Sequence, residues 1–185
     1  AGGPHGEIMA LRDAAAKGFD VRGATAYVTL EPCSHHGRTG PCCDALVEAG
    51  IGKVVASIAD PNPLVSGQGF ARLRAAGIEV EIGAGAEEAR ELNIGFFSRM
   101  ERKVPWVRLK AAASLDGRTA LDNGVSQWIT GEAARRDGHL WRARASAMLT
   151  GIGTVLADDP RLDVRLDEPR AWQPLRVVVD SRLRM

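Results

Sequence analysis

The 185-residue chain is long enough for one large or two small domains, and its 45% hydrophobic and 25% charged residues are typical of a globular protein. The formal net charge of +1 gives no support to a nucleic-acid partner, and no apolar run approaches the roughly 20 residues that a membrane span requires. Three cysteines, two of them adjacent, are poor material for disulfides. Together with the lack of a signal-peptide pattern, they favour a reducing, cytoplasmic setting.

Helical and strand patterns alternate through the first half of the chain. Alanine-rich residues 7–17 carry apolar side chains on one face and predict a helix, which Gly18 ends. The further elements expected are strands at residues 24–30, 53–58 and 78–82, helices at residues 42–49, 70–76 and 87–100, and a loop at residues 31–41. Alternation of this kind predicts an α/β sheet with helices packed on it.

The character of the sequence changes near residues 102–105, where a basic run precedes a proline. We therefore expect a domain junction, with one domain at residues 1–102 and a second at residues 103–185. The elements expected in the second domain are strands at residues 106–112, 147–151 and 175–180, helices at residues 132–145 and 154–157, and a loop at residues 114–130.

Three candidate metal ligands lie at the ends of the expected elements. His5 precedes the first helix, Cys33 follows the first strand, and Cys42 opens the second helix. One imidazole and two thiolates fill three of zinc's four tetrahedral positions and leave the fourth for water, whose pKa falls to about 7. Glu7 is close enough in sequence to move the proton. His-x-Glu with a later Pro-Cys and second Cys is the signature of zinc nucleobase deaminases, although two residues usually separate the cysteines and here eight do.

Other arrangements of these ligands stay open. A structural zinc site would take Cys43 as its fourth ligand. Adjacent helical side chains point about 100° apart, so Cys42 and Cys43 can hardly bind one metal, and Glu7 would then have no role. His35 and His36 are rival ligands, but their glycine-rich loop favours contact with a substrate, with plain solvent exposure as the alternative.

Longer motifs extend along nearly the whole chain, at residues 29–46 (TLEPCSHHGRTGPCCDAL), 56–63 (ASIADPNP), 110–119 (KAAASLDGRT), 126–130 (SQWIT) and 154–160 (TVLADDP). They closely resemble the bifunctional deaminase/reductase family of riboflavin biosynthesis. The family's own eight-residue gap between the cysteines accounts for the departure from the shorter deaminase signature.

The resemblance implies a fold and two activities. A cytidine-deaminase-like domain of three α/β/α layers would be followed by a partial dihydrofolate-reductase-like α/β domain. The first would use zinc to hydrolyse 2,5-diamino-6-(5-phosphoribosylamino)pyrimidin-4(3H)-one to 5-amino-6-(5-phosphoribosylamino)uracil and ammonia. The second would use NADPH to reduce the ribosyl group to a ribityl chain.

The resemblance also implies roles for single residues. The zinc ligands are His5, Cys33 and Cys42, and the catalytic proton shuttle is Glu7. The NADP-contacting positions are Ala112, Trp128, Thr154, Asp158 and Ser181. The substrate-contacting positions are His35, Arg38, Ser126, Arg142, Leu162 and Arg165. Arginines suit a phosphate ester, because a guanidinium binds phosphate in a bidentate fork.

The chain also departs from the family pattern. Gly6 stands where the family has alanine, which costs the helix about 1 kcal/mol but removes no functional side chain. Because the chain starts at Ala1 and stops at Met185, we expect a fragment that lacks the family's N-terminal segment and the second half of the reductase. The expected result is a zinc site that forms and a reductase that is inactive.

Two other functions stay open. A zinc deaminase acting on nucleosides or on tRNA is disfavoured by the long cysteine spacing and by the second domain. A degenerate, non-catalytic zinc-stabilised binding module is disfavoured by the intact Glu7 but favoured by the expected truncation. The expected partner is a phosphoribosylated pyrimidine, without nucleic acid or membrane, and a homo-oligomer is left open.

Overall fold

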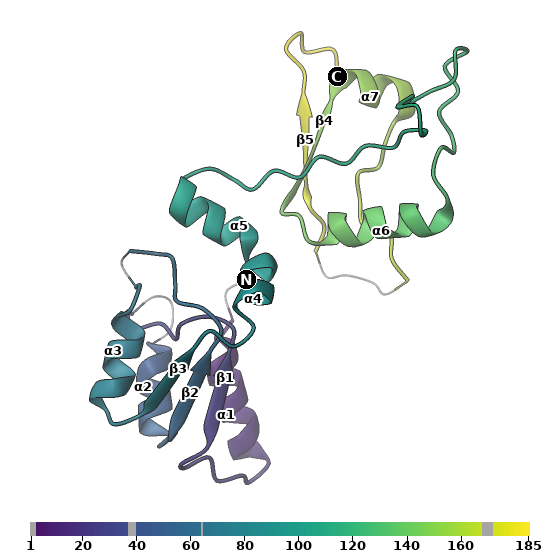
Figure 1. Ribbon diagram of the computed structural model, residues 1–185. Coiled ribbons are helices and arrows are strands. Elements are labelled where there is room, and N and C mark those ends of the chain that lie inside the picture. The colour runs from purple at the N-terminus through teal and green to yellow at the C-terminus, as the bar shows by residue number, and fades with distance from the viewer. Residues whose placement is uncertain (1–2, 37–39, 64, 168–171) are drawn as a thin grey trace. The chain divides into compact units, whose positions relative to one another are not determined.

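Parallel strands organise both halves of the chain, which confirms the predicted α/β class. The structure is a computed structural model that describes residues 3–36, 40–63, 65–167 and 172–185. The chain divides into two compact units, residues 1–107 and 108–185 (Figure 1). The predicted domain limits at residues 102 and 103 stay a prediction. Among the described helices, none is both long enough and apolar enough to cross a membrane.

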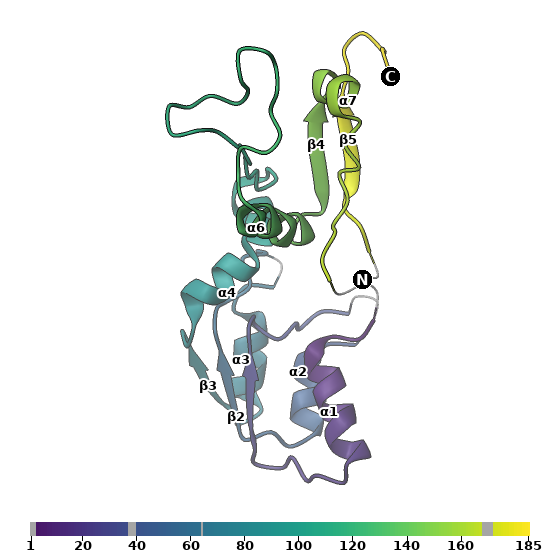
Figure 2. The ribbon, with the colours of Figure 1, turned by 90° about the vertical axis from the view of Figure 1, so that its right-hand side faces the viewer.

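Three parallel strands form the sheet of the first unit, in the order β1-β2-β3. Its elements are α1 (Gly6–Ala16), β1 (Thr25–Val28), α2 (Cys42–Glu48), β2 (Lys53–Ala56), α3 (Gln68–Ala75) and β3 (Glu79–Ile82). Each confirms the type of element predicted at that place, with ends shifted by a few residues. Because right-handed crossovers join consecutive parallel strands, α2 and α3 lie on the same face of the sheet. The first helix, α1, packs beside α2 (Figure 2).

The core of the first unit lies between these helices and the sheet. Ala26, Val54 and Val80 are register partners across the three strands and belong to the same apolar cluster. Leu46 of α2 and Leu73 of α3 join this cluster and are only 2% and 0% exposed. Burying a leucine side chain contributes about 1.5–3 kcal/mol. These contacts therefore hold both helices, and the loops that precede them, in place.

The opposite face of the sheet is covered at β2 and open at β1. Val55 points to that face and is 7% exposed, whereas its register partner Tyr27 is 78% exposed. Lys53 on the same face pairs with Glu79 and Glu81 at 2.9 Å each. Exposed ion pairs of this kind contribute about 0–1 kcal/mol. Apolar packing on the helical face therefore decides the stability of this sheet.

The prediction of one continuous helix at residues 87–100 is wrong. The structure has α4 (Ala86–Leu92), α5 (Ile94–Phe97) and a π-helical turn, η1 (Ser98–Arg102). Asn93 separates the first two, with φ −107° and ψ 18°, and its Nδ2 donates to Ala89 O at 2.9 Å. Asparagine side chains compete with the backbone for such hydrogen bonds, which accounts for the break.

The second unit holds a smaller parallel sheet. Its elements are α6 (Glu132–Ala143), β4 (Ala147–Gly151), α7 (Ile152–Asp158) and β5 (Leu175–Val179). All four confirm elements predicted there, and β4 pairs with β5 from Ala147↔Leu175 to Gly151↔Val179. The helix α7 begins where β4 ends (Figure 2).

The strand predicted at residues 106–112 is wrong. This stretch has no regular secondary structure, and in the described part of the chain β4 and β5 pair only with each other. Val107 and Leu109 are 80% and 89% exposed. The apolar side chains of this stretch, which include the β-branched Val107, favour a strand, but a strand also needs a partner to receive its backbone hydrogen bonds.

A close approach fixes the start of α3 against the turn after β1. A Cβ placed on Gly69 would lie 2.1 Å from Pro32 O, well inside van der Waals contact. Glycine is therefore required here for space. A Cβ on Gly6, in contrast, would meet nothing within 4 Å.

Gly69→Ala is predicted to lower the free energy of unfolding by about 1–3 kcal/mol, because the new methyl group pushes α3 away from Pro32. Gly6→Ala is the matched control and is predicted to leave stability unchanged or raise it by up to about 1 kcal/mol. Urea denaturation followed by circular dichroism measures both. Equal stability of Gly69→Ala and the wild type would contradict the prediction.

Candidate metal site

His5 is held where α1 begins. It is the N-cap residue of α1, with an extended backbone, and its carbonyl oxygen accepts the first helical hydrogen bond from Met9 N at 3.0 Å. The imidazole projects from this position towards the two predicted cysteine ligands. Its Nδ1 lies 3.3 Å from Cys42 Sγ and 3.6 Å from Cys33 Sγ. The structure thus brings the three side chains together, with their ligand atoms all within 4.8 Å of one another.

The two cysteines are fixed to each other through the backbone. Cys33 lies in the turn after β1 and Cys42 is the first residue of α2. Cys42 N donates to Cys33 Sγ at 3.3 Å, and Cys43 N donates to Cys33 O at 3.1 Å. These are amide groups of the helix start, which stabilise a thiolate. The eight residues between the cysteines therefore form a loop that returns to its own beginning.

This arrangement fits a zinc ion. A tetrahedral zinc bonded to nitrogen at about 2.0 Å and to sulfur at about 2.3 Å separates the two atoms by about 3.5 Å. The observed separations from Nδ1 are 3.3 Å to Cys42 Sγ and 3.6 Å to Cys33 Sγ. One nitrogen and two sulfurs also leave a fourth position open, as in catalytic zinc sites. The assignment of these residues as zinc ligands stays a prediction.

The electrostatics of the site favour a cation. Burial raises the pKa of the Cys42 thiol, and the Glu7 carboxylate and Cys33 raise it further. The Glu7 carboxylate and the Cys33 sulfur thus both disfavour a thiolate at Cys42. A divalent cation among them reverses this penalty and deprotonates its thiol ligands.

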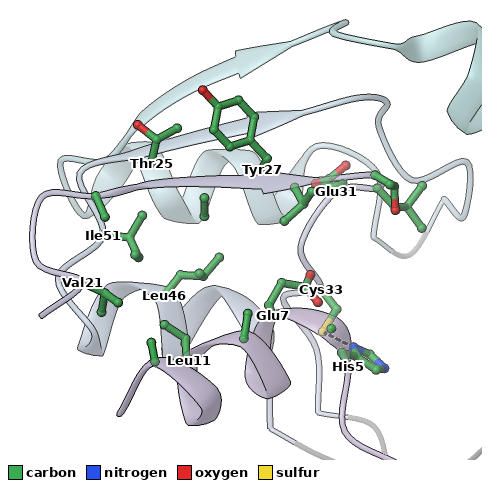
Figure 3. A pocket seen from close by; sticks show the side chains of 18 of the residues that line it. His5, Glu7, Leu11, Val21, Thr25, Tyr27, Glu31, Cys33, Leu46 and Ile51 are labelled. Atoms are coloured by element: carbon green, nitrogen blue, oxygen red, sulfur yellow. Dashed lines mark hydrogen bonds between the residues drawn. The ribbon is translucent and has the colours of Figure 1, made fainter. Parts of the chain in front are cut away.

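A cleft of about 780 Å³ opens beside the three ligands, between α1 and β1 (Figure 3). His5, Glu7 and Cys33 line its polar end. Leu11 and Ile51 line the opposite, apolar end. Cavities of this size hold small organic ligands, usually with a few polar groups at one end. The predicted proton shuttle thus faces the same space as the predicted metal ligands.

Cys43 is separated from the site. Its thiol is fully buried and donates to Pro32 O at 3.1 Å, and it also reaches Gly69 O at 3.5 Å. Burial raises the pKa of this thiol to about 12, and Cys33 raises it too. Cys43 is absent from the group of side chains that converge on one point. The geometry disfavours a structural site with four protein ligands.

The loop after Cys33 carries the predicted substrate contacts of this unit. His35 is exposed and lines the cleft, whereas His36 is exposed and does not. Arg38 lies outside the described residues. The role of His35 in substrate binding stays a prediction, and so does that of Arg38.

Asp60 also lines the cleft, and the sequence analysis did not single it out. It is 9% exposed, and burial raises the pKa of its carboxyl group. Asn62 N donates to Asp60 Oδ1 at 2.8 Å, which closes a turn after β2. The available signal was an Asp-Pro-Asn-Pro turn placed directly after a buried parallel strand, since loops at that edge commonly hold binding residues.

The predicted NADP-contacting residues of the second unit lie in two places. Thr154 and Asp158 are exposed on α7, and Ser181 is exposed just after β5. All three follow the carboxyl ends of adjacent parallel strands, where α/β sheets bind ligands. Ala112 and Trp128 lie in the irregular segment before α6, where the Arg135 guanidinium stacks 4.4 Å from the Trp128 ring. Their roles stay predictions.

Two of the predicted substrate contacts lie together near α6. Arg142 Nη1 donates to Asp163 O at 2.7 Å, and the Asp163 carboxylate pairs with Arg165. The Nε atom of Arg142 is buried and has no hydrogen-bond partner among the residues that the structure describes. His139 Nδ1 accepts a hydrogen bond from Arg165 N at 3.2 Å. Leu162 is half-buried beside this group, whereas Ser126 is exposed in the irregular segment before α6.

Comparison with known proteins defines the class of each unit. Residues 1–58 match the family described as the cytidine and deoxycytidylate deaminase zinc-binding region. Residues 105–185 match the family described as the RibD C-terminal domain. The first unit is thus of the zinc-binding deaminase class, and the second has the fold of a RibD C-terminal domain.

Relatives match both units together. Riboflavin biosynthesis protein RibD of Escherichia coli (strain K12) is 55% identical over 100% of this chain and 53% of its own length. Acinetobacter baumannii RibD has a TM-score of 0.90 at 53% identity, over 100% of this chain and 52% of that one. The diaminohydroxyphosphoribosylaminopyrimidine deaminase/5-amino-6-(5-phosphoribosylamino)uracil reductase of Thermotoga maritima has a TM-score of 0.91 at 49% identity, over 98% and 51%. The chain belongs to the RibD family and spans about half the length of these relatives.

Cys42→Ala is predicted to reduce bound zinc to well below one per chain, because it removes a ligand whose Sγ lies 3.3 Å from His5 Nδ1. Cys43→Ser is the matched control, one residue along the same helix; its hydroxyl can still donate to Pro32 O, and the variant is predicted to keep close to one zinc per chain. Metal analysis after gel filtration measures both variants. Equal zinc loss in the two would favour the four-ligand structural site.

Proposed function

We propose that the first unit is a zinc-dependent deaminase of riboflavin biosynthesis. Its reaction is the hydrolysis of 2,5-diamino-6-(5-phosphoribosylamino)pyrimidin-4(3H)-one to 5-amino-6-(5-phosphoribosylamino)uracil and ammonia. The observation that carries the proposal is the convergence of His5, Cys33 and Cys42 within 4.8 Å, at a cleft that Glu7 also lines. The deaminase activity for which the Thermotoga maritima relative is named supports the choice of substrate.

The residues of the cleft have distinct roles in this proposal. A zinc ion held by His5, Cys33 and Cys42 would supply a bound water whose pKa is lowered to about 7, and hence a nucleophile at neutral pH. Glu7 would take one proton from the attacking water and pass it to the ring nitrogen, and would then carry the second proton of that water to the departing amino group, which leaves as ammonia. The backbone of α1 holds Glu7 two residues from His5, so the shuttle and the metal ligand move as one body.

The second unit is proposed to take part in the NADPH-dependent reduction of the ribosyl group. Thr154, Asp158 and Ser181 at the carboxyl edge of β4 and β5 support contact with the cofactor. Arg142 and Arg165 support contact with the phosphate ester of the substrate. Burial and the nearby Arg165 lower the pKa of Arg142, and an anion between the two guanidinium groups would offset their repulsion.

Glu7→Gln is predicted to keep zinc and to lower the deamination rate by about 100- to 10,000-fold, because the amide cannot carry the proton. Ammonia release from the phosphoribosyl diaminopyrimidinone measures the rate, and metal analysis measures zinc. Glu48→Gln is the matched control, since Glu48 is exposed at the end of α2. Turnover retained by Glu7→Gln would refute the role of Glu7. Ammonia release from cytidine in place of this substrate would identify a nucleoside deaminase.

Arg142→Ala is predicted to weaken binding of the phosphorylated pyrimidine by about 10- to 100-fold, because charge-assisted hydrogen bonds are worth about 1.5–3 kcal/mol. Arg136→Ala on the same helix, whose side chain is 59% exposed, is the control and is predicted to bind as the wild type does. Isothermal titration calorimetry measures both affinities. Equal affinities of the two variants would contradict a phosphate site at Arg142.

A further inference from the structure

Glu31 is a buried carboxylate that the reaction proposed above does not use. It is 3% exposed and lies two residues before Cys33. Its two oxygens accept four backbone hydrogen bonds, all from one segment of the chain. Oε2 accepts from Asp60 N at 3.2 Å and Gly67 N at 3.0 Å, and Oε1 accepts from Gly69 N at 2.9 Å and Phe70 N at 3.3 Å.

These hydrogen bonds make Glu31 the cap of a helix from another part of the chain. Gly67 is the N-cap of α3, and the amides of Gly69 and Phe70 belong to its first turn. The first amides of a helix have no partner inside the helix, and its N-terminus carries a partial positive charge that favours an anion. Gly67 has no side chain with which to cap the helix. Glu31 supplies both the acceptors and the charge that α3 requires.

The same contact reaches the proposed metal ligands. The start of α3 lies against Pro32, because a Cβ on Gly69 would fall 2.1 Å from Pro32 O. The Cys43 thiol bridges the two segments, with Pro32 O at 3.1 Å and Gly69 O at 3.5 Å. Cys33 follows Pro32 directly, and its carbonyl accepts from Cys43 N at 3.1 Å. The position of Cys33 thus depends on how the turn is held between α2 and α3.

Glu31 also holds the far wall of the cleft. Asp60 N donates to Glu31 Oε2, and Asp60 lines the cleft together with Cys33. A single side chain therefore sets the distance between a proposed metal ligand and the loop that faces it. The Glu31 carboxylate accepts from both ends of the segment between residues 60 and 70, and it therefore ties Asp60 and the start of α3 to the turn that carries Cys33.

We propose that Glu31 is a positioning residue of the metal site, which clamps the start of α3 to the Pro32–Cys33 turn and so sets the geometry of Cys33 as a zinc ligand. This inference rests on the proposed zinc site. Residues that orient metal ligands without touching the metal change metal affinity by about 10- to 100-fold when they are replaced. Glu31 acts through Cys33 and takes no proton in the reaction.

Glu31→Gln tests the proposal. The amide keeps the shape of the side chain but replaces one acceptor oxygen with an NH₂ group, which then faces two backbone N–H donors. The expected result is zinc affinity lowered by about 10- to 100-fold in a chelator competition assay. The ligand-field spectrum of the Co²⁺-loaded protein should also change, because it reports the arrangement of the two sulfurs and the nitrogen.

A matched control separates positioning from general destabilisation. Val54→Ala removes part of a core side chain that is 0% exposed on β2, at a site outside the clamp. It should lower the melting temperature yet keep the wild-type zinc affinity and Co²⁺ spectrum. If Glu31→Gln keeps the wild-type zinc affinity and Co²⁺ spectrum, the inference about Glu31 is wrong, while the proposed function is untouched. The same holds if Val54→Ala loses as much zinc affinity as Glu31→Gln. A wild-type chain that binds no zinc would overturn the proposed function as well.

A second measurement needs no variant and decides the matter if Glu31→Gln does not fold. Coupling between two sites is reciprocal. If the Glu31 hydrogen bonds raise the affinity for zinc by some factor, bound zinc must shift the equilibrium towards the hydrogen-bonded state by the same factor. Amide hydrogen exchange at Gly69 and Phe70 should therefore slow by about 10- to 100-fold when zinc is added to the metal-free protein. The amide of Ala76, which donates to Arg72 O at the other end of α3, is the internal control. Equal slowing at all three amides, or none, would overturn the proposal.

Discussion

The candidate site depends on the geometry of a parallel sheet, in which all strands end at the same edge and the following segments meet there. The turn after β1 carries Cys33, the loop after β2 carries Asp60, and α2 begins at the same edge with Cys42. His5 and Glu7 come to this edge from the start of α1, which packs beside α2. A nitrogen and two sulfurs from three separate segments thus come within 4.8 Å of one another.

Backbone amides balance the negative charge that this arrangement concentrates. The Glu31 carboxylate is buried at the start of α3, and the two cysteine sulfurs gather at the start of α2. Helix N-termini are suited to both, because their free N–H groups and partial positive charge stabilise anions. The first turn of α3 is therefore structural, whereas the first turn of α2 faces the proposed metal. The polar residues of the cleft are positioned by the starts of these helices, and the apolar core holds the helices in place.

The second unit contrasts with the first in how its predicted residues are spread. Thr154 and Asp158 lie on α7 at the carboxyl edge of the sheet, whereas Arg142 is tied to Asp163 near α6. No comparable convergence joins these groups among the described residues of this unit. Family membership covers both units, yet the chain spans about half the length of its relatives. The second unit therefore presents its predicted contacts on separate elements, unlike the single convergent site of the first.

The sequence by itself determined the types of most elements and the residues of the candidate site, because both depend on local patterns. Periodicity and glycine placement predicted the strands and helices of the first sheet, and the His-x-Glu and cysteine spacing singled out His5 and Glu7. Tertiary structure decided the rest. Residues 106–112 have the composition of a strand but lack the pairing that makes one. Glu31 looked like an ordinary residue before the cysteine, because its four partners follow it in sequence by about thirty residues or more and only folding brings them to it.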